Sequence, residues 1–205
     1  DFCSYCSVKL IKGSIFSYPE ASIINKIGKN VEQGCKEIWL TAQDTGAYGL
    51  DTGKIKLPGL LNIILDNVPG KYKIRLGMIN PRHAREMINE LISVYQDSRM
   101  FKFLHIPVES GNNEVLGKMN RKYNVHDFKE IVNAFRRYVK GITIATDIIV
   151  AFPTETELQF QDSLHLIHEI KPDVINISRF SPRPNTPASR MKQLPGNIKN
   201  ERSRA

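Results

Sequence analysis

The sequence predicts an α/β protein with a parallel sheet, arranged either as a partial β/α barrel or as a doubly wound sheet. Short strand-like runs alternate with amphipathic helices along the 205 residues, and the runs are mostly apolar on both faces. Strands buried on both faces are typical of parallel sheets. Because strand and helix alternate without a break, the connections should be right-handed crossovers. In either architecture, ligands bind beyond the carboxyl ends of the strands.

Five segments rich in β-branched and aromatic residues are the predicted strands. They are Glu37–Thr41, Lys73–Met78, Phe103–Val108, Thr143–Phe152 and Val174–Phe180. A sixth strand is expected just upstream, ending where Cys3 begins. Six β/α units would then be present.

The segments between the strands carry apolar residues at helical spacing, which predicts that these residues face the core. The stripes are Ile23, Ile24, Ile27 and Val31; Met87, Ile88, Leu91 and Ile92; Phe128, Ile131, Val132 and Phe135; and Phe160, Leu164 and Ile167. Ser17 and Glu20, with Pro19 between them, predict a capping box that opens the first helix. Asp51–Pro58 should be a loop that leads to a short helix through Asp66.

The composition is that of a globular protein, with 41% hydrophobic and 24% charged residues. No apolar run reaches about 18 residues, so we expect no membrane span. The start of the chain lacks the pattern of a secretory signal. With 3 cysteines, a disulfide framework is not expected. A reducing compartment, the cytoplasm, is therefore predicted.

Positive charge is concentrated near the end of the chain. The net charge is +8, and seven basic residues against the single acid Glu201 account for six of these eight charges. The basic residues are Arg179, Arg183, Arg190, Lys192, Lys199, Arg202 and Arg204. Such a segment indicates either a polyanionic partner, nucleic acid first, or a solvated tail.

Cys3 and Cys6 stand three residues apart, so both thiolates can bind one metal centre. The pair alone is compatible with redox chemistry, half a zinc site or part of an iron–sulfur ligand set. Zinc would need a second pair of ligands, but Cys35 stands alone, and His165 and His168 lie on a packing helix. Redox chemistry favours a helix after the cysteines, whereas Ser7–Gly13 is predicted to be a loop.

Polar residues follow the predicted strands, where an active site would assemble with the Cys3/Cys6 loop. They are Gln43, Asp44, Thr45, Asn80, Glu109, Ser110, Gly111, Thr146, Asp147, Pro153, Glu155, Arg179 and Ser181. Asp147 lies within an apolar strand, where a carboxylate needs a partner, and a functional role is favoured. Gln43 and Asp44 either belong to the site or cap the following turn.

The motifs in order resemble a known family. Cys3-Ser4-Tyr5-Cys6, followed by a basic loop that ends in Gly13, resembles the end of the C-x-x-x-C-x-x-C loop of radical S-adenosylmethionine (SAM) enzymes. Glu37–Gly49 is similar to the tRNA methylthiotransferases that act on threonylcarbamoyladenosine. Further matching motifs are Arg75–Pro81, Phe103–Gly111, Ala145–Ile149 and Arg183–Ala188. The resemblance runs through nearly the whole chain.

The resemblance implies a partial (β/α)6 TIM-like barrel of the radical SAM type. Residues 1–181 would be the radical SAM core, and residues 182–205 a basic linker toward a carboxyl-terminal RNA-binding domain. Cys3 and Cys6 would be the second and third ligands of a [4Fe–4S] cluster whose open iron binds SAM. The first ligand is expected two positions upstream of Asp1.

The resemblance also implies roles in a SAM site. The implied cofactor-binding residues are Tyr5, Gln43, Asp44, Glu109, Ser110, Asp147, Phe152 and Arg179. Tyr5 would sit against the adenine, Phe152-Pro153 would support the adenine, and Arg179 would neutralise a carboxylate. Glu109 and Asp147 are in addition the catalytic candidates. Two positions depart from the family pattern: Glu109 replaces a usual Gln, and Thr154 replaces a usual Gly.

The function expected from the resemblance is insertion of a methylthio group into threonylcarbamoyladenosine next to the anticodon of tRNA. Alternatives in the same class are methylthiotransferases for isopentenyladenosine or for a ribosomal-protein aspartate. A non-catalytic RNA- or metal-binding barrel is the alternative from another class. Sulfur donor, electron donor and oligomeric state do not follow from the sequence.

Overall fold

The computed structural model describes residues 2–205. Asp1, where the predicted core domain begins, lies outside the described residues. The chain forms two compact units. The first unit comprises residues 2–14, 107–132 and 145–205, and the second comprises residues 15–106 and 133–144.

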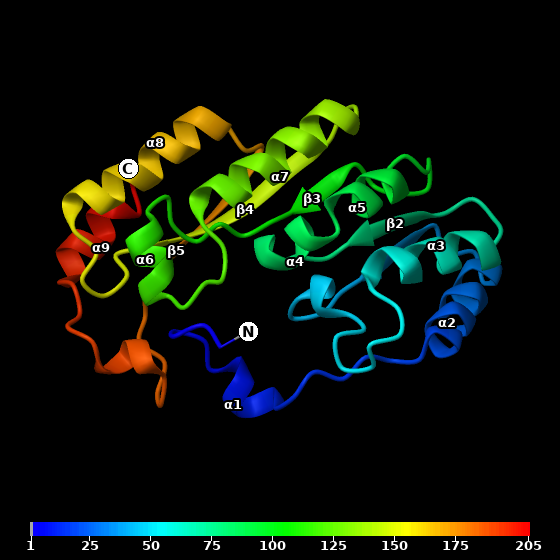
Figure 1. Ribbon diagram of the computed structural model, residues 1–205, viewed down its shortest axis with the longest axis horizontal. Helices are drawn as coiled ribbons and strands as arrows, with labels where there is room; N and C mark the ends of the chain where they lie inside the picture. Colours follow the sequence, from blue (N-terminus) through cyan, green and yellow to red (C-terminus); the bar gives the residue numbers. More distant parts are fainter. Residues whose placement is uncertain (1) are drawn as a thin grey trace. The chain divides into compact units, whose positions relative to one another are not determined.

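The second unit is built on parallel strands that alternate with helices. Strands β1 (Glu37–Leu40) and β2 (Lys73–Leu76) pair in parallel, in register from Glu37↔Lys73 to Leu40↔Leu76. Helices α2 (Glu20–Glu32) and α3 (Leu57–Asn67) lie side by side in this unit (Figure 1). Its other elements are η1 (Thr45–Ala47), α4 (Pro81–Glu86), α5 (Ile88–Val94) and β3 (Phe103–His105).

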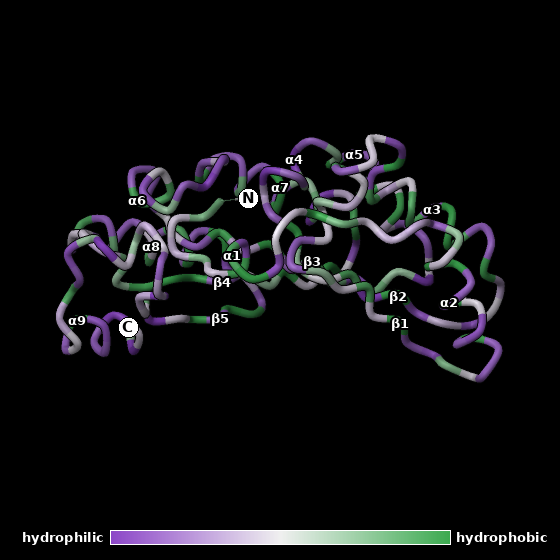
Figure 2. The backbone as a smooth tube through the Cα atoms, turned by 90° about the horizontal axis from the view of Figure 1, so that it is seen from below, coloured by the Kyte–Doolittle hydropathy of each residue, from purple (hydrophilic) through white to green (hydrophobic). Residues whose placement is uncertain are grey.

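The first unit contains a second parallel pair. Strand β4 (Thr143–Val150) begins in the second unit and continues into the first, where it pairs with β5 (Val174–Arg179) from Ala145↔Val174 to Val150↔Arg179. Much of β4 is hydrophobic, whereas α9 is hydrophilic (Figure 2). The helical elements are α1 (Val8–Lys12), α6 (Asn113–Lys118), α7 (Val125–Tyr138, which ends in the second unit), α8 (Glu157–Ile170), η2 (Pro187–Arg190) and α9 (Gly196–Arg202).

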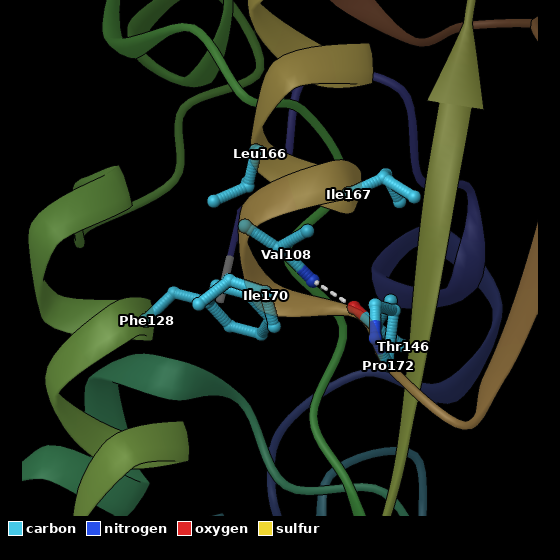
Figure 3. Close-up of a pocket in the computed structure, with 7 residues that line it drawn as sticks. All are labelled: Val108, Phe128, Thr146, Leu166, Ile167, Ile170 and Pro172. Carbon is cyan, nitrogen blue, oxygen red and sulfur yellow. Dashed lines mark hydrogen bonds between the residues drawn. The ribbon is translucent and has the colours of Figure 1, made fainter.

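The core of the first unit packs α8 and the start of α7 against the strands. Leu166 and Ile170 of α8 meet Phe128 of α7 and Val108 (Figure 3). Thr146 of β4 is 1% exposed, and its Oγ1 accepts a hydrogen bond of 3.1 Å from the Val108 N–H. Thr146 is therefore part of a closed core here, and its hydroxyl satisfies the backbone.

The five predicted strands and the helices between them are confirmed, with strand ends up to three residues shorter than predicted. The prediction of apolar burial on both faces is wrong for β5. Val174 and Ile177 are 42% and 53% exposed, and most of β5 is exposed along its length. Among the described residues, no helix is long and apolar enough to cross a membrane.

Two local predictions are also wrong. Ser17 does not cap α2, because its N–H and hydroxyl both donate to the Asp51 carboxylate at 2.8 and 2.5 Å, and Pro19 takes the N-cap position without a side-chain cap. Ser7–Gly13 is not a plain loop, because Val8–Lys12 forms the short helix α1. This single turn ends at Gly13, whose φ of 71° suits glycine.

Candidate metal and cofactor site

The Cys3–Cys6 loop is a tight turn held by the backbone around it. The Cys6 N–H donates to the Cys3 carbonyl at 3.2 Å. Ser4 is buried, and its N–H and hydroxyl donate to the carbonyls of Met119 and Lys118 at 2.9 and 2.7 Å. Both thiols remain partly exposed. The loop is thereby fixed to the end of α6, with its two sulfurs accessible to a ligand.

A buried arginine connects this loop to a carboxylate. Arg121 and Glu109 are each 8% exposed, and Arg121 Nη2 lies 2.5 Å from Glu109 Oε1. The other terminal nitrogen, Nη1, donates to the Cys3 sulfur at 3.2 Å. One guanidinium therefore bridges a predicted metal ligand and a predicted catalytic carboxylate.

Two tyrosines complete this cluster. The Tyr5 hydroxyl donates to Glu109 Oε1 at 2.9 Å, and the Tyr123 hydroxyl donates to the carbonyls of Pro107 and Val108 at 3.1 Å each. Burial, reinforced by the Glu109 charge, raises the pKa of Tyr5, so its phenol stays protonated as a donor.

The guanidinium of this cluster is a stable cation. Burial alone would lower the pKa of Arg121, but the interactions with Tyr123 and Glu109 outweigh the effect of burial. The pKa of Arg121 is therefore raised above its ordinary value. Arg121 therefore remains charged beside Glu109 and Cys3. This charge offsets that of the Glu109 carboxylate.

Glu109 sits at a strained position beside β4. Its φ is 69°, and its N–H donates to the Asp147 carbonyl at 2.8 Å, while the Ile149 N–H donates back to the Glu109 carbonyl at 2.9 Å. The backbone of β4 thus holds Glu109 in a conformation that costs free energy outside glycine. This pairing aligns the residue next to Asp147 in space.

The turn after Glu109 is packed tightly on α8. Ser110 is fully buried, with its hydroxyl 3.4 Å from that of Ser163, and the Gly111 N–H donates to the Ser163 hydroxyl at 2.8 Å. A Cβ on Gly111 would lie 2.5 Å from the Asp162 carbonyl oxygen. Only glycine fits this close approach. Ser110 is buried in the same turn, beside the Ser163 hydroxyl, and therefore supports the turn in addition to any role in binding.

The remaining predicted residues of the first unit lie on β4, β5 and the loop after β4. Asp147 is half-buried, and its Oδ1 accepts a hydrogen bond of 2.7 Å from the Asn176 amide. Phe152 is fully buried, with its ring centroid 6.3 Å from that of Tyr5. Arg179 is exposed and donates to Asn200. Phe152 thus supports the Tyr5 ring.

Gln43 and Asp44 belong to the second unit. Gln43 is exposed. Asp44 caps η1, because its Oδ1 accepts from the Gly46 and Asn80 N–H groups at 3.0 and 3.1 Å. His83 Nε2 lies 3.5 Å from Asp44 Oδ2. Asp44 therefore caps the following turn, which is one of the two roles that the sequence left open for it.

The donor set fits two positions of an iron–sulfur ligand set. Cys3 and Cys6 are thiols, the ligand type that iron–sulfur clusters use. Among the described residues, no group of three or more His, Cys, Asp or Glu side chains could hold a metal ion. The described chain thus offers two thiolates and no competing zinc-type set.

Three residues with clear contacts to the site were missed from the sequence. Arg121 and Tyr123 follow α6 with no periodic or motif signal. The requirement that a buried Glu109 have a cation partner could have pointed to Arg121. Asn176 could have been found by placing Val174–Arg179 in register against Asp147.

Comparison with known proteins agrees with this donor set. Residues 1–167 match the family model described as the radical SAM superfamily. A probable threonylcarbamoyladenosine tRNA methylthiotransferase of Archaeoglobus fulgidus is 48% identical over 202 residues, which are 98% of this chain and 47% of that protein. The threonylcarbamoyladenosine tRNA methylthiotransferase of Homo sapiens is 42% identical over 98% of this chain and 35% of that protein. The chain spans about half the length of the archaeal relative and about a third of the human one.

Solved structures show the same fold. The radical SAM methyltransferase TsrM of Kitasatospora setae superposes with a TM-score of 0.71 at 18% identity, covering 91% of this chain and 36% of that one. Methylornithine synthase superposes with a TM-score of 0.55 at 18% identity, covering 98% of this chain and 57% of that one. These likenesses confirm the predicted fold class, an α/β chain of the radical SAM type. The family match over most of its length shows that the chain belongs to the radical SAM superfamily.

Proposed function

We propose that the protein containing this chain is a radical SAM tRNA methylthiotransferase that inserts a methylthio group into threonylcarbamoyladenosine next to the anticodon. The observation that carries the proposal is the 48% and 42% identity, along 98% of this chain, to archaeal and human proteins of that name. The thiol pair of Cys3 and Cys6 supports it. Those names favour this substrate over isopentenyladenosine or a ribosomal-protein aspartate.

Cys3 and Cys6 would supply two of the three thiolates of a [4Fe–4S] cluster, with SAM as the second cofactor. When bound, the reduced cluster supplies the electron that cleaves SAM. Cys3 and Cys6 present their sulfurs from one turn whose backbone is fixed to Met119 and Ala188. These hydrogen bonds restrain the turn that carries the two sulfurs, and a restrained ligand pair favours metal binding.

The chain's other residues would bind and orient SAM and the nucleoside. Tyr5, partly buried beside the cysteines, would sit against the adenine, and the fully buried Phe152 would support it by packing on the Tyr5 ring. Glu109 and Asp147 would line the nucleoside side with Ser110, and the hydrogen bond from Asn176 holds the Asp147 carboxylate in one orientation. Gln43 and Asp44 are proposed to lie near the methionine amino end of SAM. Arg179 is proposed to neutralise a carboxylate.

We also propose residues 1–181 as the catalytic core and residues 182–205 as the basic segment toward an RNA-binding domain. Residues 182–205 belong to the first unit, and part of this segment packs within it, because Ala188 is fully buried and Arg202 is 6% exposed. Transfer RNA is the proposed partner, and the cytoplasm the proposed location.

The proposal is tested with the full-length protein, reconstituted with iron and sulfide under anaerobic conditions and reduced. Deoxyadenosine release and the mass of the modified nucleoside are measured with tRNA that carries threonylcarbamoyladenosine. We expect both products, and neither from Cys3→Ala/Cys6→Ala. A folded protein that binds no cluster and cleaves no SAM would rule out this function. Cleavage of SAM with no change in the tRNA would support the proposed radical SAM activity and refute the proposed tRNA substrate.

A further inference from the structure

Exposed apolar side chains flank the Cys3–Cys6 loop in the first unit. Phe2, Leu10 and Ile11 are 68%, 60% and 77% exposed, and none of the five residues of α1 is buried. A helix this short depends on packing for its stability, yet α1 buries no side chain. Large apolar side chains gathered at a surface commonly mark an interaction site. The proposed roles of the site residues leave this surface unexplained.

Two lysines border these apolar side chains. Lys12 is exposed, and Lys9 Nζ lies 4.8 Å from the centre of the Phe2 ring, which is a cation–π contact. The contact brings α1 back beside the residue that precedes Cys3. Residues 2–14 include no acidic residue, so the local charge is positive. An apolar centre with a charged border is typical of a protein–protein interface. We call five of these residues the α1 surface: Phe2, Lys9, Leu10, Ile11 and Lys12.

We propose that the α1 surface docks an acidic protein that carries one electron. The carrier would pass its electron to the cluster proposed for Cys3 and Cys6, so that the carrier is oxidised and the cluster is reduced. No bond is formed or broken in this step. The inference rests on the proposed function, because that function needs a reduced cluster on these two cysteines.

The position and the chemistry of the α1 surface favour an electron carrier over RNA. A carrier has to dock close to the cysteines, because electron transfer slows steeply with distance, and the α1 surface flanks their loop along the chain. Phosphates are contacted by basic and polar groups, which leaves Leu10 and Ile11 without a role in binding RNA. An acidic protein can use the lysines and the apolar side chains together. Electron-transfer complexes also have small interfaces, which a surface of this size can supply.

The first measurement compares two reductants of the full-length, reconstituted protein. Reduced ferredoxin is an acidic one-electron carrier that has to dock, whereas dithionite is a small ion that needs no protein interface. Lys9→Glu/Lys12→Glu should lower the ferredoxin-driven release of deoxyadenosine about tenfold or more, because the two proteins would then repel each other. The release driven by excess dithionite should stay at the wild-type level.

The second measurement is of binding alone and needs no turnover. Isothermal titration calorimetry of oxidised ferredoxin with the full-length protein, at several salt concentrations, gives the affinity and its dependence on salt. Leu10→Ser/Ile11→Ser should lower the affinity about tenfold, because apolar area would no longer be buried, and should keep the salt dependence. Lys9→Glu/Lys12→Glu should lower the affinity and remove the salt dependence of an attractive contact.

Lys26→Glu/Lys29→Glu is the matched control, because it makes the same change in net charge at two exposed positions of α2. It should change neither the affinity for ferredoxin nor the release of deoxyadenosine. Melting temperatures of all variants are compared with that of the wild type. Equal melting temperatures would show that the substitutions act on docking and not on folding.

The outcomes separate this inference from the proposed function. A wild-type protein that releases no deoxyadenosine with either reductant would refute the function and this inference with it. Release with dithionite, together with ferredoxin affinities that are the same in the wild type and in both α1-surface variants, would overturn the inference and leave the function standing. Two further results overturn it in the same way. One is a loss of tRNA binding with unchanged ferredoxin binding, which would assign the surface to RNA. The other is a lower melting temperature with unchanged ferredoxin binding, which would show that another part of the full-length protein covers the surface.

Discussion

Glu109, Ala151 and Thr154 are non-glycine residues with left-handed backbone, and all three stand beside or after β4. Their φ angles are 69°, 58° and 66°. Left-handed backbone costs a non-glycine residue roughly 1–2 kcal/mol. Strain of this kind is retained where the surrounding structure requires it, and such positions are common at binding sites. Of the three, Glu109 lies next to Asp147, the other catalytic candidate, because its N–H donates to the Asp147 carbonyl.

Thr154→Gly should stabilise the protein. The Glu155 N–H donates to the Phe152 carbonyl at 3.0 Å, which closes a turn with Pro153 second and Thr154 third. A positive φ at the third position favours glycine there. Relief of roughly 1–2 kcal/mol of strain exceeds the roughly 0.5–1 kcal/mol of chain entropy that glycine loses. Urea unfolding should show a net gain of about 1 kcal/mol.

Thr154→Ala is the control for this prediction. Alanine keeps the Cβ and its strain, so its free energy of unfolding should stay close to that of the wild type. A Thr154→Gly variant that is no more stable than Thr154→Ala would show that the left-handed conformation is not a cost here.

His83 should make the stability of the protein depend on pH. It is 4% exposed, and burial lowers its pKa although Asp44 and Glu86 oppose that shift. Below the ordinary histidine pKa of about 6.5, the unfolded chain binds a proton that the folded chain does not. Stability should therefore fall as the pH is lowered from about 7.5 through about 6.5, and it should fall less in His83→Gln.

Melting temperatures at several pH values measure this difference. His126→Gln is the control, because His126 is exposed on α7 and its side chain is 75% accessible. An equal loss of stability in the wild type and in His83→Gln would contradict the prediction.

Site residues were predictable where a motif or a strand end marked them. Cys3, Tyr5, Glu109 and Asp147 all lie in the first unit, and hydrogen bonds join Tyr5 to Glu109 and Cys3 to Arg121. Arg121 was not predictable in this way, because its partners are 12 and 118 positions away along the chain. Such contacts depend on tertiary folding and leave no local pattern.

At the scale of elements, a buried ion pair joins α9 to the segment just before α8, and α9 lies beside the start of α8 (Figure 1). Glu155 is 3% exposed and accepts from the Ala151 N–H at 2.8 Å and from Arg202 Nη1 at 2.7 Å. Arg202 also reaches Glu157 at 3.1 Å. Burial raises the pKa of Glu155 even though Arg202 opposes the shift.

Arg202→Met should destabilise the protein by about 3–5 kcal/mol, because Glu155 would stay buried without its cation. The double variant Glu155→Gln/Arg202→Met removes both charges and should recover much of this loss. Arg204→Met is the matched control at an exposed position and should change little. Unfolding in urea gives the three free energies. A single Arg202→Met variant as stable as the control would show that α9 does not depend on the pair.

The long helices were predictable, whereas the shortest ones were not. The stripes of α2, α7 and α8 extend over 13 or 14 residues, enough for helical periodicity to appear. Helices α1, α4 and α6 have 5 or 6 residues and depend on tertiary contacts. Ser17 follows the capping-box pattern but bonds Asp51, whereas the actual box is Thr156 with Gln159 at α8. A local rule cannot decide between a nearby backbone group and a distant carboxylate.

At the scale of the whole molecule, the positive charge near the end of the chain is divided between structure and surface. Within the described residues, Arg179 donates to Asn200, Lys199 to the Phe180 carbonyl at 3.0 Å, and Arg202 to Glu155. The other four basic side chains are exposed: Arg183, Arg190, Lys192 and Arg204. These four side chains are therefore accessible for the proposed contacts with tRNA.

Neutralising two of these exposed charges should lower the affinity for tRNA and should make that affinity less sensitive to the salt concentration. Each lost phosphate contact should lower the slope of log affinity against log salt by roughly 0.7–0.9. Arg183→Gln/Lys192→Gln in the full-length protein should therefore reduce this slope. The control is Lys26→Gln/Lys29→Gln, which makes the same change in net charge at two exposed positions of α2 and should leave the slope unchanged. Filter-binding at several salt concentrations measures both slopes. Equal slopes for the two pairs would mean that net charge, and not this segment, attracts the RNA.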